Sequence, residues 1–333
     1  MLASDVPPFV DKHALLFASH RHCGGEEQHS RQPEEAVREC ELPVVDLAAG
    51  EEAETRAEIA RAAAEWGFFQ VVNHGIGREL LEAVRAEQAK LFGLPFEEKL
   101  RCELLKDSYR WGTPTATSLA EFSWSEAFHV PLAAVSDENV SADGEHASFR
   151  AVMERFAAAV TRLGRRLTGV LAESLGRTRR FFDENCTERT CFLRLNRYPP
   201  CPVSPEVFGL VPHTDSDFLT ILYQDEVGGL QLMKDSRWVS VKPNPEALII
   251  NIGDLFQAWS NGVYKSVEHK VMVNAVKDRY SVAFFLCPSY DTMIESSEEP
   301  SIYRKFTFGQ YRQQVQEDVK IIGHKVGLRR FLL

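Results

Sequence analysis

A series of short apolar segments in the C-terminal half constrains the fold of this chain more than any other feature. From residue 190 onward, runs rich in β-branched and aromatic residues are separated by breaks that contain Gly, Pro, Asn or Asp. Several short strands with turn signals between them predict a β-sandwich or a roll that encloses a cavity. The predicted strands are Cys191–Tyr198, Phe218–Tyr223, Gly229–Met233, Trp238–Lys242, Leu248–Ile252, Lys265–Val273 and Tyr280–Leu286.

Outside this region, apolar residues recur mostly at helical spacing. The longest such pattern, Glu145–Leu175, predicts a scaffold helix on which a sheet packs. Further helices are predicted at Glu52–Trp66, at Arg78–Phe92 and, as a lid over the cavity, at Phe306–Val319. Short strands are predicted at 42–47 and 68–72.

These elements predict a mainly β protein with flanking helices and an α/β N-terminal region. We divide the chain into a flexible N-terminal extension (1–40), an N-terminal region (41–145), the scaffold helix (146–185), a β-rich core (186–300) and a C-terminal helix and tail (301–333). Within the extension, an amphipathic turn around Ala14–Phe17 is expected to dock on the core.

Composition excludes several classes of protein. The formal net charge of −10 argues against nonspecific nucleic-acid binding, which requires a basic surface. No apolar stretch approaches the length that spans a bilayer, and the N-terminus lacks the apolar core of a secretory signal. Seven cysteines without a Cys-x-x-Cys motif indicate reduced thiols. We therefore expect a cytoplasmic protein that can also enter the nucleus by diffusion and that binds neither nucleic acid nor membrane. Its oligomeric state stays open.

Five residues near the predicted strands form a pattern of metal ligands and an anion-binding group. His213-x-Asp215 arises by chance about once in two chains of this composition, so that pair alone is weak. The pair gains weight from His269 and from Arg279-x-Ser281, because all lie on or beside predicted strands in this order. Residues i and i+2 of an extended segment point to the same face, so His213 and Asp215 are expected to converge.

Other residues of the same types have simpler interpretations. Asp217 is a competing carboxylate two residues after Asp215, whereas His74 and His324 are interpreted as ordinary structural histidines. Two imidazoles and one carboxylate leave open positions on a metal, which suits the oxygen chemistry of non-haem Fe(II).

Together these residues resemble the plant 2-oxoglutarate- and Fe(II)-dependent dioxygenases. The resemblance runs from about Leu42 to Leu328 and includes Trp66–Gly75 and Asn196–Pro200. Within that family, Tyr109–Gly112 and Ser123–Leu132 resemble gibberellin 2-oxidases, especially those that act on 20-carbon precursors. The resemblance implies a double-stranded β-helix, or jelly roll, as the core.

The resemblance also implies a cofactor set and a reaction. Fe(II) would be held by His213, Asp215 and His269. The cosubstrate 2-oxoglutarate would be bound by Arg279, Ser281, Tyr198 and Asn196. Dioxygen would be the oxidant and ascorbate the reductant. The implied reaction is 2-beta-hydroxylation of a gibberellin, a small diterpenoid acid, which inactivates the hormone.

Substrate contacts are harder to assign, because a cavity for such a molecule should be largely apolar with few polar anchors. Five candidates are Phe285, Tyr109, Arg110, Phe128 and His129. Strand parity places Phe285 on the face of Arg279 and Ser281. It separates Phe128 from His129 without deciding which of the two faces inward. Arg110 has two interpretations, a partner for the substrate carboxylate or for a surface acid.

Three other functions compete with gibberellin oxidation. The first is a plant dioxygenase that acts on a flavonoid or another hormone intermediate. The second is a catalytically silent hormone-binding protein, against which the intact metal ligands and Arg-x-Ser argue. The third is a zinc hydrolase, in which Arg279 and Ser281 would have no evident role.

Overall fold

The computed structural model describes residues 5–23, 37–48, 52–102, 105, 107–135, 146–201 and 207–333, of which 19–23 only as backbone. Two mostly antiparallel sheets lie face to face, and residues of both line one cavity between them. The eight-stranded sheet runs in the order β2 (Val44–Asp46), β3 (Phe68–Val72), β11 (Leu248–Ile252), β8 (Leu219–Gln224), β13 (Arg279–Leu286), β6 (Phe192–Tyr198), β5 (Glu126–Pro131) and β4 (Tyr109–Trp111). The five-stranded sheet runs in the order β1 (Arg38–Cys40), β10 (Arg237–Val241), β9 (Leu230–Lys234), β12 (His269–Met272) and β7 (Phe208–His213).

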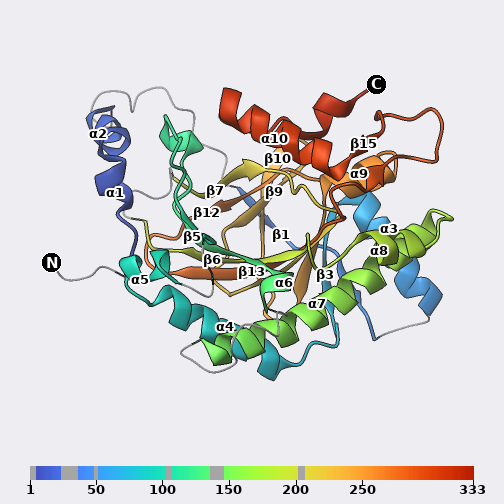
Figure 1. Cartoon of the computed structure of the whole chain (residues 1–333), viewed down its shortest axis with the longest axis horizontal. Coiled ribbons are helices and arrows are strands. Elements are labelled where there is room, and N and C mark those ends of the chain that lie inside the picture. Colours follow the sequence, from blue (N-terminus) through green and yellow to red (C-terminus); the bar gives the residue numbers. More distant parts are fainter. Residues whose placement is uncertain are drawn as a thin grey trace.

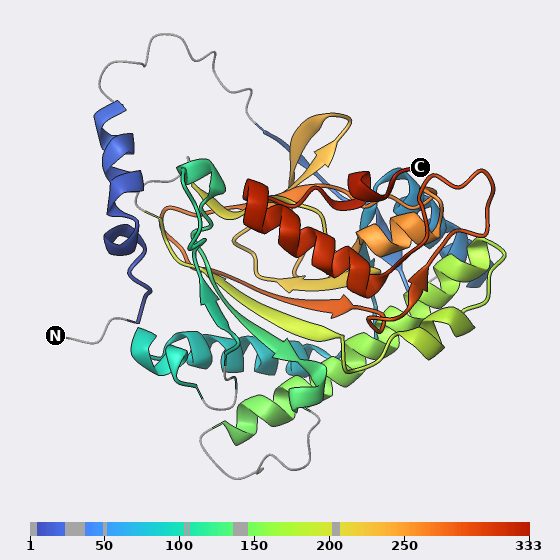
Figure 2. The same cartoon turned by 45° about the horizontal axis from the view of Figure 1, so that its top comes forward.

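Helices cover the outer face of the larger sheet. Figure 1 shows α4 (Arg78–Phe92) and α7 (Ala147–Ser174) running side by side beneath it, and α3 (Glu52–Glu65) also packs on α7. The apolar side of α7, which includes Met153, Val160 and Leu167, is fully buried. The C-terminal helix α10 (Phe308–Ile322) lies on the side of the molecule away from α4 and α7 (Figure 1 and Figure 2). The predicted jelly-roll core with a scaffold helix is therefore confirmed.

Most predicted elements occur within a few residues of their expected bounds, but one strand is shorter than predicted and a few short elements were not predicted. The strand predicted at Lys265–Val273 is shortened to β12, because the backbone at 265–266 bonds to Ala63 O and to the Gln257 side chain instead of a neighbouring strand. Strand β7 was not predicted, because Gly209 and Pro212 interrupt its apolar pattern. The short helices α8 (Arg180–Asn185) and α9 (Asp254–Trp259) also lacked a clear periodic signal.

Part of the N-terminal extension is packed on the core, as expected for the turn around Ala14–Phe17, although the rest of the extension was predicted to be flexible. Residues 5–23 include α1 (Phe9–Lys12) and α2 (Ala14–Cys23), and both Phe9 and Phe17 are 2% exposed. The ring of Phe9 stacks on Trp124 with 4.6 Å between centroids. Burial of two aromatic rings favours this docking over a loose chain. Residues 24–36 lie outside the described part.

A buried ion cluster fixes the outer face of β6. Glu126 on β5 is fully buried and pairs with Lys99 at 2.8 Å and with Arg197 of β6 at 3.1 Å. Arg197 also reaches Asp278 at 2.7 Å. Because alternate residues of a strand face opposite sides, anchoring Arg197 orients Asn196 and Tyr198 toward the interior.

We expect Glu126→Gln to lower the free energy of unfolding by about 3–5 kcal/mol, because Lys99 would be left buried without its anion. Urea denaturation of the metal-free protein would measure the loss. The exposed Glu79→Gln on α4 is the matched control. Equal stability of the two variants would show that the buried pair contributes no net stability.

Candidate active site

The two histidines of the predicted metal site face each other across a pair of strands. His213 ends β7 and is the direct antiparallel partner of His269, the first residue of β12. Their ring centroids lie 4.3 Å apart. Asp215 lies two residues after the end of β7, in the loop that leads to β8 and not on the strand itself. One potential ligand atom from each of the three residues lies within 4.8 Å of the others.

Hydrogen bonds to Nδ1 of both histidines leave their Nε2 atoms free to bind a metal. Nδ1 of His213 lies 2.8 Å from Val211 O, and Nδ1 of His269 lies 3.1 Å from Val267 O. If each Nδ1–H donates to its carbonyl, each Nε2 keeps a lone pair for a metal. Both Nε2 atoms face Oδ1 of Asp215, at 3.6 and 3.7 Å.

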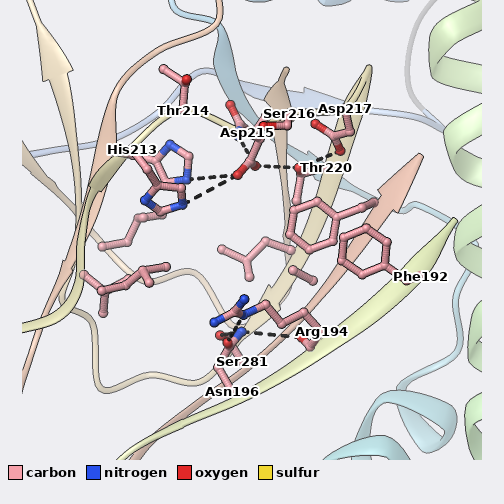
Figure 3. A pocket seen from close by; sticks show the side chains of 18 of the residues that line it. Phe192, Arg194, Asn196, His213, Thr214, Asp215, Ser216, Asp217, Thr220 and Ser281 are labelled. Carbon is pink, nitrogen blue, oxygen red and sulfur yellow. Dashed lines mark hydrogen bonds and ion pairs between the residues drawn. The ribbon is translucent and has the colours of Figure 1, made fainter. Parts of the chain in front are cut away.

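The other carboxylate oxygen of Asp215 is fully occupied by neighbouring donors. Oδ2 accepts a hydrogen bond from Thr220 Oγ1 at 2.6 Å and another from Asn251 Nδ2 at 2.5 Å. Figure 3 shows the Thr220 contact to the right of Asp215. The arrangement therefore directs two nitrogens and one oxygen at a common point, which fits a divalent iron site.

Protonation favours the same arrangement. Burial, and next the neighbouring His269, lower the pKa of His213 to about 3, so this imidazole is neutral at physiological pH. Burial opposes ionisation of Asp215, but His269, His213 and Thr220 outweigh it and hold its pKa below the usual value.

Asp217, the competing carboxylate, lies outside this cluster. Its Oδ2 atom is 3.0 Å from Thr220 Oγ1. Burial, and next the charge of Asp215, raise its pKa well above the usual value. In the described part of the chain, the group of potential metal ligands contains Asp215 and not Asp217.

A second layer of polar contacts holds the loop that carries Asp215. Asp254, at the start of α9, accepts hydrogen bonds from Thr214 and from the Tyr311 hydroxyl of α10 and pairs with Lys325 at 2.7 Å. Lys325 Nζ also donates to Thr214 O and to Ser216 Oγ, both at 2.9 Å. Residues from the C-terminal part of the chain thus fix a loop more than one hundred positions earlier.

Gly253 permits this loop to pack closely on α9. A Cβ atom at position 253 would lie 2.2 Å from the Asp217 backbone oxygen, so no larger residue fits without a backbone shift.

The predicted cosubstrate residues lie together on two paired strands. In the ladder between β13 and β6, Arg279 is opposite Tyr198 and Ser281 is opposite Asn196. Asn196 Nδ2 lies 3.3 Å from Ser281 Oγ. The guanidinium carbon of Arg279 lies 4.9 Å from the centroid of the Tyr198 ring.

Arg279 has the unmet bonding capacity that a bound carboxylate would satisfy. It is 1% exposed, and Nη2 donates to Gln224 Oε1 at 2.7 Å. Within the described residues, Nε and Nη1 are buried without an acceptor. A buried guanidinium with free donors requires an anion, and its planar fork matches a carboxylate. The residues present therefore fit 2-oxoglutarate.

The candidate metal ligands and the candidate cosubstrate residues line one cavity of about 540 Å³. Figure 3 places His213 and Asp215 on one side of it and Asn196, Ser281 and Arg194 on the other. Its remaining wall is largely apolar and includes Phe68, Leu210, Leu222, Leu230, Ile249 and Val271. A site of this size and composition suits a small apolar molecule with a few polar groups.

Two of the five predicted substrate residues line this cavity and three do not. Phe285 and His129 both contribute to the wall. Phe128 is 0% exposed and packs in the core against Phe92, so it faces the opposite side of β5. Tyr109 is also in the core, where its hydroxyl donates to Glu126. Arg110 is exposed outside the cavity lining, with Nη1 donating to Tyr109 O at 2.7 Å.

Sequence reasoning missed several polar residues of the site. Arg194 occupies the same face of β6 as Asn196 and Tyr198, so strand parity could have identified it. Asn251 is the one amide within the otherwise apolar β11, which is a recognisable signal. The positions of Lys325 and Arg312 depend on how the C-terminal segment folds back, and local pattern gives no indication of that.

The fold and this site together define a non-haem iron oxygenase, and sequence profiles agree. Residues 189–288 match the 2OG-Fe(II) oxygenase superfamily. Residues 42–148 match a second family, the N-terminal region of non-haem dioxygenase in morphine synthesis. The chain belongs to the 2OG-Fe(II) oxygenase superfamily, whose cofactors are Fe(II) and 2-oxoglutarate.

Within that superfamily the chain is similar to two plant enzymes of one activity. It is 59% identical to gibberellin 2-beta-dioxygenase 6 of Oryza sativa subsp. japonica, over 89% of this chain and 86% of that protein. It is 58% identical to gibberellin 2-beta-dioxygenase 8 of Arabidopsis thaliana, over 89% of this chain and 88% of that protein.

Solved structures show the same fold. JOX2 in complex with 2OG, Fe and JA has a TM-score of 0.71 and 33% identity, covering 88% of this chain and 91% of JOX2. The dioxygenase for auxin oxidation in rice has a TM-score of 0.72 and 30% identity, covering 88% of this chain and 100% of that one. In the described residues, no helix has the length and apolar character needed to cross a membrane.

We expect Lys325→Met to weaken metal binding by about 10-fold, because the loop that carries Asp215 would lose its tie to the C-terminal segment. Anaerobic titration of the purified protein with Fe(II), followed by calorimetry, would measure the affinity. Lys320→Met, an exposed lysine on α10, is the matched control. Unchanged Fe(II) affinity in Lys325→Met would show that β7 and α9 hold the loop in place without Lys325.

Proposed function

We propose that the protein is a gibberellin 2-beta-dioxygenase that uses Fe(II), 2-oxoglutarate and dioxygen to hydroxylate and inactivate the hormone. The observation that carries the proposal is one cavity in which His213, Asp215 and His269 converge, Arg279 presents free donors, and the remaining wall is apolar. The similarity to two gibberellin 2-beta-dioxygenases over nearly nine-tenths of the chain supports the choice of substrate.

The residues of the chain bind, orient and shield the reactants. Bound Fe(II) supplies the oxidising chemistry, in which decarboxylation of 2-oxoglutarate is coupled to hydroxylation of a C–H bond. His213, His269 and Asp215 would hold the Fe(II) ion, and three protein ligands would leave binding positions for 2-oxoglutarate and dioxygen. Arg279 and Ser281 fix the far carboxylate of 2-oxoglutarate, and Asn196 and Tyr198 limit its movement.

The apolar wall determines what reaches the reactive centre. Leu210, Leu230 and Val271 of the smaller sheet face Leu222 and Ile249 of the larger one across the cavity. A fused-ring diterpenoid buries its hydrocarbon skeleton against such surfaces, which excludes water and holds one ring position toward the metal. We also propose a preference for 20-carbon gibberellins, which the resemblance of β4 and β5 supports.

The decisive assay combines purified protein, Fe(II), ascorbate and 2-oxoglutarate with a panel of 19-carbon and 20-carbon gibberellins and a set of flavonoids. We expect a gibberellin product heavier by one oxygen, hydroxylated at C-2, together with stoichiometric succinate. His269→Ala should abolish gibberellin-dependent succinate release because one metal ligand is lost. Conversion of flavonoids alone would establish the competing dioxygenase function, and binding of a gibberellin without turnover would indicate a silent hormone-binding protein.

We expect Arg279→Ala to raise the KM for 2-oxoglutarate by about 30-fold or more, equivalent to about 2 kcal/mol, because a buried charge-assisted pair is lost. Succinate release at varied 2-oxoglutarate concentration measures this effect. Arg237→Ala, an exposed arginine on β10, is the control. An unchanged KM would show that Arg279 does not bind 2-oxoglutarate.

A further inference from the structure

Two arginines that face the cavity have no acidic partner among the residues that the structure describes. Arg194 of β6 and Arg312 of α10 both line it. Arg194 Nε donates to Asn196 Oδ1 at 2.9 Å, and in the described part of the chain its two terminal nitrogens contact no acceptor. The guanidinium carbon of Arg312 lies 6.0 Å from the centroid of the Phe308 ring. Neither forms an ion pair with any carboxylate that the structure describes.

Two other cations close to this cavity have acidic partners. Arg197, the neighbour of Asn196 on the outer face of β6, pairs with Glu126 and Asp278. Lys325, which also lines the cavity, pairs with Asp254. Arg279 has a role in binding 2-oxoglutarate. A guanidinium inside a largely apolar cavity without an anion is poorly solvated, so Arg194 indicates an anionic ligand. The half-buried Arg312 adds a second cation on the same cavity.

A flat aromatic wall lies beside these arginines. Phe285 stacks on Phe192 with 4.5 Å between centroids and an angle of 10°. Phe192 in turn stacks on His129 with 4.0 Å and 27°. Burial, and next the charges of Arg194, Arg312 and Arg110, lower the pKa of His129 to about 4. This imidazole is therefore neutral near pH 7 and extends the aromatic wall, and the cationic groups of the wall are the arginines.

The position of Arg194 suits an anchor at a distance from the reacting carbon. Figure 3 shows Arg194 across the pocket from His213 and Asp215. Arg312 lies on α10, whose Val315 and Val319 line both this cavity and a neighbouring surface groove, so Arg312 belongs to the rim. A ligand that contacts both arginines would span from the inner wall to the rim and leave its hydrocarbon rings against the apolar surface.

We propose that this cavity recognises a diterpenoid diacid, with Arg194 binding one carboxylate and Arg312 the other. The inference rests on the proposed gibberellin oxidation and makes its substrate class specific. A 20-carbon gibberellin can carry two free carboxylates, whereas in a 19-carbon gibberellin one of them is closed into a neutral lactone. Two unpaired guanidinium groups match the diacid, and the lactone would leave one of them without an anion.

The test compares charge removal on the protein with charge removal on the substrate. Initial rates are measured with a 20-carbon gibberellin diacid and with each of its two monomethyl esters, for the wild type, Arg194→Met and Arg312→Met. Each substitution should raise the KM for the diacid by about 10- to 100-fold, the value of a hydrogen bond to a charged group. For each arginine, esterifying the carboxylate that it binds should raise the KM of the wild type by about the same factor as the arginine substitution does. With that ester, the arginine variant should show little further rise in KM. A 19-carbon lactone should behave like one of the esters.

Controls separate a binding role from a structural one. Arg155→Met, an exposed arginine on α7, should leave every KM unchanged. Arg194→Lys, which retains the charge, should recover part of the affinity for the diacid and covers the case in which Arg194→Met folds poorly. The KM for 2-oxoglutarate should not change in Arg194→Met, although Arg194 contacts Asn196.

Two results would overturn the inference while leaving the proposed function intact. One is wild-type conversion of gibberellins with an unchanged diacid KM in both arginine variants. The other is an equal rise in KM for the diacid and both esters, which would indicate a general distortion of the cavity. If the wild type converts no gibberellin, the proposed function itself fails and this inference fails with it.

Discussion

The cross-strand pair of His213 and His269 is the contact on which the active site depends. Directly opposed residues of an antiparallel ladder have their Cβ atoms about 5 Å apart, so the pairing of β7 with β12 alone brings two imidazoles together. A shift of one residue in this ladder would turn one histidine to the other face of the sheet. Asp215, Thr220 and Asn251 then complete a site whose position is already determined by strand register.

The two faces of β6 show how the protein separates structural charge from functional charge. On the outer face, Arg197 is neutralised by Glu126 and Asp278, which stabilises the strand. On the inner face, Arg194 keeps donors without an acceptor among the described residues, and Arg279 on the adjacent strand does the same. The internal ion pairs therefore stabilise the scaffold, whereas the arginines that face the cavity keep donors for a bound ligand.

Local pattern was sufficient to predict most of the fold. Period-two and period-3.6 spacing identified the strands of the core and the helices α3, α4, α7 and α10, because each buries one continuous apolar face. The candidate ligands were found from their order along the chain. The parity of β5 could not be decided, because both faces of that strand carry large side chains, and Phe128 proved to belong to the core. Strand β7 was hidden by Gly209 and Pro212, although it carries His213.

The contact between Lys325 and residues Thr214 and Ser216 has a consequence for biosynthesis. A ribosome completes the ligand-bearing loop more than one hundred residues before it adds the lysine that ties this loop down. During that interval both histidines and the aspartate can already be present in a partly folded chain whose loop is still untethered. Tight iron loading is then expected to follow the docking of α10 and the segment after it, so metal capture would be one of the last events in maturation.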